Sequence, residues 1–397
     1  MTYRRAAIPA LAGALLLTAL LWWAGASVDA LHLRGTTEAL GGRMTADLQN
    51  WLTPWSYDPP DAVRFGTGAL GDIGDPASAD PGRYLSLYGT GMQIRFAAVA
   101  AFFLPGALLL VRALPPVNGR TPVTLLAVWA WGLVAGTLAV TVSAPWLIAA
   151  QGHGGYRLLP QLASVSSAGR QIVVVTALVS AAVTVLTARI TAKGTEPPPL
   201  NDAPARAARL AATAGTAVVA FSSVVLSHQS VAASVQTASL PGRLLSEPGD
   251  LLRQWLLLGG WSGPAAGQTG HWFLYRLADA LLLAVVWWAL RRLPVLLTRA
   301  TGTAMVAGTV CATVVGLLAN QLLQAAVTGA DSGMRWGWQH LSGSLGHGVP
   351  AALTWGVAAG LTAVVTLRLT GGRPGNDGPA VPPPAPAPAE PSLRPAG

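Results

Sequence analysis

The chain of 397 residues is 52% hydrophobic and only 10% charged, with a mean hydropathy of +0.48 and a formal net charge of +9. A soluble domain needs far more surface charge, so this composition excludes that class and indicates an all-α, multi-pass membrane protein. Arginine supplies 24 of the 25 basic residues and Lys193 is the one lysine, a usage typical of high-GC bacterial genomes. The single cysteine, Cys311, lies in an apolar run, which excludes an intramolecular disulfide and a cysteine-based metal site.

Eight stretches have the roughly 17–25 apolar residues that a helix needs to cross the hydrocarbon core. In chain order they cover residues 6–28, 95–112, 122–149, 169–188, 209–228, 272–290, 301–328 and 349–367. The first also resembles a signal peptide, because Arg4-Arg5 precedes its apolar run and Ala24-Gly25-Ala26 follows it. The run from residue 6 to residue 23 is longer than the roughly 7–15 residues of a signal core, so we expect it to remain as a membrane helix.

Basic residues are concentrated in the short connections between these stretches and near the two ends of the chain. The positive-inside rule places those segments in the cytoplasm, where 14 basic residues accompany four acidic ones, against 11 and 12 on the other side. The sequence thus predicts a bacterial plasma-membrane protein with both termini in the cytoplasm. We expect its basic loops to contact anionic membrane lipids. No nucleic-acid partner is expected, because the charge is not gathered on a soluble module.

The chain also repeats itself. At an offset of 179 residues, Thr90-Gly91 matches Thr269-Gly270, and the run 187–191 matches the run 366–370. At an offset of 200, Thr37, Leu40, Gly42 and Arg43 match Thr237, Leu240, Gly242 and Arg243; after a slip of four residues, Leu48, Trp51 and Leu52 match Leu252, Trp255 and Leu256. A repeat of this length is too long for a solenoid, so the sequence predicts one duplicated four-helix membrane unit.

Four crossings per unit give both units the same orientation, as parallel repeats related by a pseudo-two-fold axis along the membrane normal. We expect the first repeat over residues 1–192 and the second over residues 209–370. Residues 193–208, which include Pro197-Pro198-Pro199, are expected to form a cytoplasmic linker. Residues 371–397 form a Pro/Ala-rich cytoplasmic tail, which we expect to be disordered. The seam between the repeats is the natural place for a site.

Each repeat has a long extracytoplasmic loop after its first helix, residues 29–94 and 229–271. Each loop contains a short amphipathic segment with one tryptophan, Trp51 in the first and Trp255 in the second. Such segments suit a helix that lies in the headgroup region. They are interpreted as membrane-surface or loop-packing helices, with recognition of an envelope partner or ligand as the alternative.

Asp279 is the one carboxylate expected inside the membrane, where an ionisable residue marks a functional site or a buried pair. Arg276 lies three residues earlier on the same helical face. The predicted helix over residues 301–328 brings further polar groups to a similar depth, and His271 is expected at the mouth. The candidate substrate pocket therefore consists of His271, Arg276, Asp279, Asn320, Gln321 and Gln324. The alternative is an ion pair with amide hydrogen bonds that hold the helices together.

All six histidines fall on the predicted outer side, where they permit a metal or haem site as a further hypothesis: His32, His153, His228, His271, His340 and His347. Their spacing contains no HxH, HxxxH or HExxH pattern, so no metal ligand set is assigned and any cofactor stays open. The sequence contains no Walker A motif and no serine nucleophile elbow. No enzymatic activity is expected.

In topology, each half resembles the four-helix permease unit of FtsX-type ABC transporters, which has its large outer segment after the first helix. The outer loops here are shorter than that family's folded outer domain, and no residue motif carries the resemblance. Two functions are compatible with the sequence. One is a transporter or permease-like protein for a small molecule or lipid-like substrate. The other is a non-enzymatic envelope scaffold or assembly factor that acts through Trp51 and Trp255.

Overall fold

The structure is a computed structural model of the chain. It describes residues 3–33, 35–60, 63, 81–116, 119–151, 158–192, 204–239, 241, 246–259, 269–297, 301–332 and 334–370. The secondary structure of these residues is helical, without a strand. Of the predicted linker 193–208, the structure describes residues 204–208, and residues 205–208 belong to helix α9 (Ala205–Ala220). Residues 193–203 and the predicted tail from residue 371 onward lie outside the described part.

Eight helices of the described part are long and apolar enough to cross a membrane, which confirms the prediction of a multi-pass helical membrane protein. They are α1 (Tyr3–Ala26), α5 (Pro81–Ala113), α6 (Thr121–Ala150), α8 (Arg170–Thr191), α9 (Ala205–Ala220) with its π-helical continuation η5 (Phe221–Leu226), α12 (Thr269–Leu296), α13 (Gly302–Ser332) and α14 (Met334–Thr370).

Two of these helices begin well before the apolar stretch that predicted them. α5 begins at Pro81 rather than near residue 95, and α14 begins at Met334 rather than near residue 349. The apolar stretch marks the segment that fits the hydrocarbon core, whereas backbone hydrogen bonds allow a helix to continue beyond it. The end of the predicted loop 29–94 is therefore helical.

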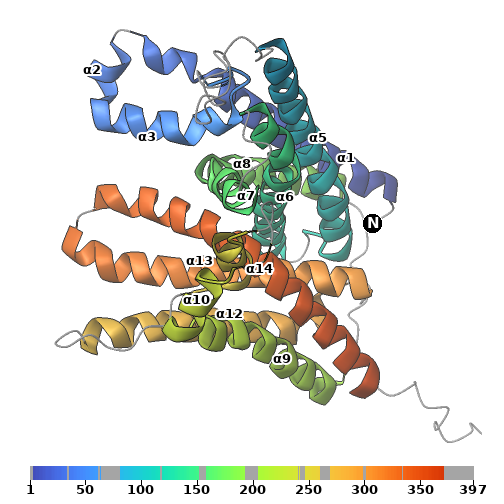
Figure 1. Cartoon of the computed structure of the whole chain (residues 1–397). Helices are drawn as coiled ribbons and strands as arrows, with labels where there is room; N and C mark the ends of the chain where they lie inside the picture. The colour runs from blue at the N-terminus through green and yellow to red at the C-terminus, as the bar shows by residue number, and fades with distance from the viewer. Residues whose placement is uncertain are drawn as a thin grey trace, which may run out of the picture.

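Shorter helices lie between the long ones. They are η1 (Asp29–His32), α2 (Thr36–Leu40), α3 (Gly42–Leu52), η2 (Thr53–Trp55), α7 (Leu158–Ser167), α10 (Gln229–Gln236) and α11 (Gly249–Leu256). The two amphipathic tryptophan segments are helical, as expected, in α3 and α11. We call the end of the bundle that carries these short helices the loop end. The opposite end, with the start of α1 and the arginine-bearing last turns of α8 and α14, is the basic end (Figure 1).

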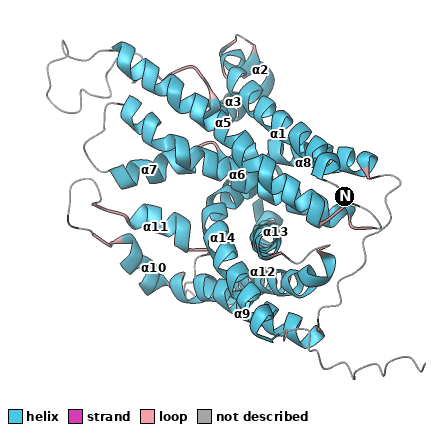
Figure 2. Cartoon of the chain, turned by 90° about the vertical axis from the view of Figure 1, so that its right-hand side faces the viewer, coloured by secondary structure: helices cyan, strands magenta, loops and turns pink. Residues whose placement is uncertain are grey.

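The long helices pack in two groups. α1 contacts α5 and α8, and α6 contacts the same two helices; likewise α9 contacts α12 and α14, and α13 contacts the same two. The groups meet where α6 contacts α13 and α14, where α8 contacts α14, and, at the loop end, where α7 contacts α11 (Figures 1 and 2).

Small residues allow these helices to approach closely. Gly356 and Gly360, four residues apart on α14, face the backbone of α13: a Cβ on Gly356 would lie 2.7 Å from Cα of Val310, and one on Gly360 would lie 2.8 Å from Cα of Val306. Helices in lipid associate through this kind of close packing, since lipid tails leave no hydrophobic drive between them. The core of the bundle is accordingly rich in buried alanine and valine.

Candidate functional site

Four of the six predicted pocket residues come together between α12 and α13. Arg276 Nη1 lies 3.0 Å from Asp279 Oδ2, and the other carboxylate oxygen, Oδ1, accepts a hydrogen bond of 3.0 Å from Asn320 Nδ2. Gln324 Nε2 donates to Asn320 Oδ1 at 2.6 Å. The spacing of three residues on α12 and of four on α13 places these groups on facing helix surfaces.

Both oxygens of the Asp279 carboxylate thus have partners within the bundle. Asp279 and Asn320 are buried, and the charge is balanced by Arg276 from the same helix turn. This geometry matches the alternative of an ion pair with interhelical amide bonds, a local network that joins α12 to α13.

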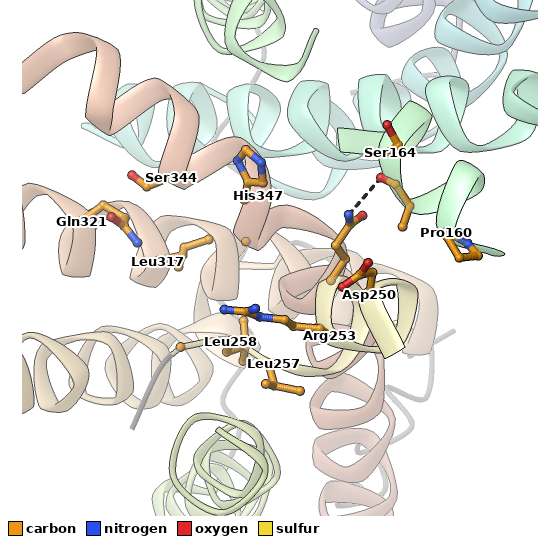
Figure 3. A pocket seen from close by; sticks show the side chains of 14 residues that line it. Pro160, Ser164, Asp250, Arg253, Leu257, Leu258, Leu317, Gln321, Ser344 and His347 are labelled. Carbon is orange, nitrogen blue, oxygen red and sulfur yellow. Dashed lines mark hydrogen bonds between the residues drawn. The ribbon is translucent and has the colours of Figure 1, made fainter. Parts of the chain in front are cut away.

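Gln321 points to a different place, a pocket of about 490 Å³ at the loop end (Figure 3). We call it the seam pocket, because both groups of helices build it: α7 from the first, and α11, α13 and α14 from the second. Its lining residues are Pro160, Ala163, Ser164, Asp250, Arg253, Gln254, Leu257, Leu258, Gly259, Leu317, Gln321, Ser344, His347 and Gly348.

The seam pocket and the Asp279 network are neighbours. Gly259 lines the pocket, and a Cβ on this glycine would lie 3.9 Å from Asp279 Oδ1. The backbone N–H of Gly259 donates to the hydroxyl of Ser227 (3.3 Å), which directly follows the π-helical turns of η5. Asp279 therefore stands behind the pocket wall at Gly259.

The polar groups of the pocket come from three sides, with Gln321 on α13, Arg253 on α11 and His347 on α14 (Figure 3). The Nδ1 atom of His347 lies 2.6 Å from the carbonyl oxygen of Gly343. Because a carbonyl only accepts, Nδ1 carries the proton in this contact, and Nε2 of the neutral ring is an acceptor. Asp250 and Arg253 contribute one negative and one positive charge.

A buried arginine, Arg170, donates hydrogen bonds to residues that form the wall of the pocket. It is only 3% exposed and donates from Nη1 to the carbonyl oxygen of Gly346 (3.0 Å) and from Nη2 to Oε1 of Gln254 (3.3 Å). Gln254 in turn donates to the carbonyl oxygen of Ala163 at 2.9 Å and accepts from Ser166 at the same distance. Arg170 thereby ties α8 to α11 and α14.

In the described part of the chain, the hydrogen-bond partners of Arg170 are all uncharged oxygens, so its positive charge is not neutralised by a carboxylate. Together with Arg253 and Asp250 it leaves the region of the seam pocket with a net positive charge among the described groups. Sequence reasoning missed Arg170. The available signal was an arginine at the second position of the predicted span 169–188, which has no acidic residue nearby in sequence.

Sequence reasoning also missed a second buried arginine, which likewise lies at the start of a predicted span. Arg95 is 2% exposed; its Nε donates to Ser143 Oγ at 2.9 Å, its Nη1 donates to the carbonyl oxygen of Pro54, and its guanidinium carbon lies 5.5 Å from the ring centre of Trp55. Trp55 is fully buried and donates from Nε1 to the carbonyl oxygen of Gly169 (2.8 Å). This cluster fixes η2 on the long helices of the first group.

The two predicted loop tryptophans lie on the short helices, Trp51 on α3 and Trp255 on α11, and both are half-buried. Trp255 belongs to the helix that supplies Arg253 and Gln254 to the seam pocket. Trp51 lies on a helix whose neighbours are α2, η2 and α8.

Among the histidines, His347 lines the seam pocket and His228 Nδ1 lies 2.9 Å from Ser230 Oγ. His271 is in the first turn of α12, but its side chain, like those of His32 and His340, lies outside the described part, as does all of His153. The described residues contain no group of three His, Cys, Asp or Glu residues placed to hold a metal ion.

Comparison with known protein families, with curated proteins and with solved structures finds no match to this chain.

Proposed function

We propose that the chain is a permease-like protein of the bacterial plasma membrane that binds a small, negatively charged molecule or lipid-like headgroup in the seam pocket. The observation that carries this proposal is the seam pocket itself, about 490 Å³ in volume and lined by polar groups from both groups of helices. Its volume lies in the usual range of small-molecule sites, and such sites occur preferentially between structural units. The uncompensated charge of Arg170 favours an anion.

The proposed architecture is a pair of parallel four-helix repeats that extend over residues 1–192 and 209–370. The pattern of packing supports it, because α1, α5, α6 and α8 contact one another as α9, α12, α13 and α14 do. Relative motion of two such units around a site between them is a common basis of transport. We propose that both termini and the basic end face the cytoplasm, as the positive-inside rule favours.

A difference between the two halves supports a binding role for the second. The alignment of Trp51 with Trp255 pairs Trp55 with Gly259. In the first half, the fully buried Trp55 indole fills the space at this position. In the second half, Gly259 has no side chain and forms part of the pocket wall. A tryptophan at position 259 would project into this region, so the second half retains space that the first half fills.

The proposal is tested by a thermal-shift screen of the full-length protein in detergent, with inorganic phosphate, small carboxylates and lysophospholipids as probes. We expect at least one anionic probe to raise the melting temperature, and we expect Arg253→Gln and Gln321→Leu to weaken that effect. Arg43→Gln is the matched control, because it removes an arginine from α3, another loop-end helix, at a position outside the lining of the seam pocket. No anionic shift in wild type, or equal shifts in all variants, would contradict the proposal.

The second candidate function is a non-enzymatic envelope scaffold. One observation favours it: α2 and α3 project from the bundle at the loop end, and Met44 on α3 is 51% exposed (Figure 1). A scaffold would tolerate changes in the seam pocket and lose partner binding when Trp51 and Trp255 are replaced by alanine. We propose no enzymatic activity and no nucleic-acid partner in either case.

A further inference from the structure

A second cavity, of about 730 Å³, lies between the two groups of helices toward the basic end. α5 and α6 form one side and α13 and α14 form the other. Its described lining is almost entirely apolar, with Leu109, Trp131, Val306 and Leu361 as examples. We call it the apolar cavity. It shares no lining residue with the seam pocket.

Polar groups gather at one end of the apolar cavity. The one charged residue in its described lining is Arg368, in the last turn of α14, and Thr303 is near the start of α13. The Arg368 guanidinium reaches over the start of α13, since a Cβ on Gly302 would lie 4.0 Å from its Nη2 atom. Farther in, the indole N–H of Trp131 already donates to the carbonyl oxygen of Phe102 (3.0 Å). The cavity thus has a cationic mouth and an apolar body.

The length of the cavity matches one leaflet of a bilayer. Along α14 its lining runs from Leu353 to Arg368, a rise of about 22 Å at about 1.5 Å per residue. Half of a hydrocarbon core is about 15 Å, and the headgroup region adds to it. Two lining residues of α14, Leu361 and Val365, are each 54% exposed, so the cavity opens sideways on the outer surface of the bundle.

We infer that the apolar cavity binds an anionic phospholipid from the leaflet at the basic end. One acyl chain lies between the α5–α6 and α13–α14 pairs, and the phosphate contacts Arg368. A guanidinium forms charge-assisted, bidentate hydrogen bonds with phosphate oxygens. The apolar lining fits a lipid chain and offers nothing to free phosphate. Negatively charged lipid heads are attracted to the surrounding arginines of the basic end. This inference is independent of the proposed function, because it concerns other residues at the other end.

The test is native mass spectrometry of the full-length protein in detergent with phosphatidylglycerol, with phosphatidylcholine of the same chains, and with inorganic phosphate. One arginine near the membrane surface contributes about 1 kcal/mol of binding free energy, so we expect wild type to bind phosphatidylglycerol about fivefold more tightly than phosphatidylcholine. We expect Arg368→Gln to abolish this preference. The matched control is Arg189→Gln, which removes the exposed last-turn arginine of α8. This position aligns with Arg368 in the repeat, but Arg189 does not line the apolar cavity. This control should keep the preference.

The acyl-chain part is tested by filling the cavity. Leu361→Trp or Val365→Trp should remove bound phosphatidylglycerol, whereas Leu369→Trp, at a 79% exposed position outside the lining, should not. These positions are exposed, so the variants are expected to fold, and thermal unfolding checks this. The inference is overturned if wild type binds phosphatidylglycerol and phosphatidylcholine equally, or if Arg368→Gln and Arg189→Gln lower lipid binding to the same degree. It is also overturned if both cavity-filling variants still bind phosphatidylglycerol, or if inorganic phosphate raises the thermal stability of the protein as much as the lipid does.

Discussion

The Asp279 network leads to a quantitative prediction about stability. In Asp279→Asn, the amide oxygen still accepts from Asn320, but the amide nitrogen faces Arg276, so the ion pair between positions 276 and 279 is lost. Removing one partner of a fully buried ion pair costs about 3–5 kcal/mol. Both side chains here are 13% exposed, so some hydration remains and we expect a smaller loss, about 2–3 kcal/mol of unfolding free energy.

The assay is a double-mutant cycle, with unfolding free energies measured by SDS titration in mixed micelles. The double variant Arg276→Gln/Asp279→Asn should recover most of the loss and lie within about 1 kcal/mol of wild type, since both charges of this ion pair are removed together. Arg292→Gln, which removes an exposed arginine from the same helix, should change stability by less than about 0.5 kcal/mol. If Asp279→Asn keeps wild-type stability and instead abolishes the response to an anionic probe, the carboxylate belongs to the ligand site and the structural argument is wrong.

Two further predictions concern packing and topology. Gly356→Val should lower the unfolding free energy by about 1–3 kcal/mol, because its Cβ meets the α13 backbone, whereas Gly89→Ala on α5, which has open space around it, should be neutral or slightly stabilising; thermal unfolding compares them. Cys311, which is 2% exposed, should resist a membrane-impermeant maleimide in intact cells. In a Cys311→Ala background, Ser234→Cys at the loop end should be labelled from outside and Arg189→Cys only after permeabilisation; the reverse pattern would refute the proposed orientation.

The sequence alone predicted the membrane class and the eight long helices, because apolar length is a direct requirement of the hydrocarbon core. It did not locate the starts of α5 and α14, since helical hydrogen bonding continues into polar residues. The aligned glycines of the two halves have different backbone conformations. At Gly169 the backbone is left-handed (φ +69°) and separates α7 from α8, whereas the aligned Gly348 lies inside the continuous helix α14.

Helical spacing also explains which candidate residues contact one another in the structure. Asn320 and Gln324 are one turn apart and both point toward the Asp279 side, while Gln321 is rotated by about 100° and lines the seam pocket instead. Depth in the membrane put these three residues in one predicted pocket. The direction of each side chain divides them between an internal network and a cavity.

The two buried arginines show why the remainder of the site could not be predicted. An arginine in a membrane span leads a reader of the sequence to search for an acidic partner, but Arg95 and Arg170 are held mainly by carbonyl, hydroxyl and amide oxygens. The partners of Arg170 on Gly346 and Gln254 are far away in sequence, and no helical or strand period relates them. Because these partners belong to α14 and α11, Arg170 helps to fix the contact between the two groups of helices. It also supplies positive charge beside the seam pocket. Any movement of α11 or α14 relative to α8 must therefore break hydrogen bonds to a buried cation, which couples the shape of the pocket to the packing of the bundle.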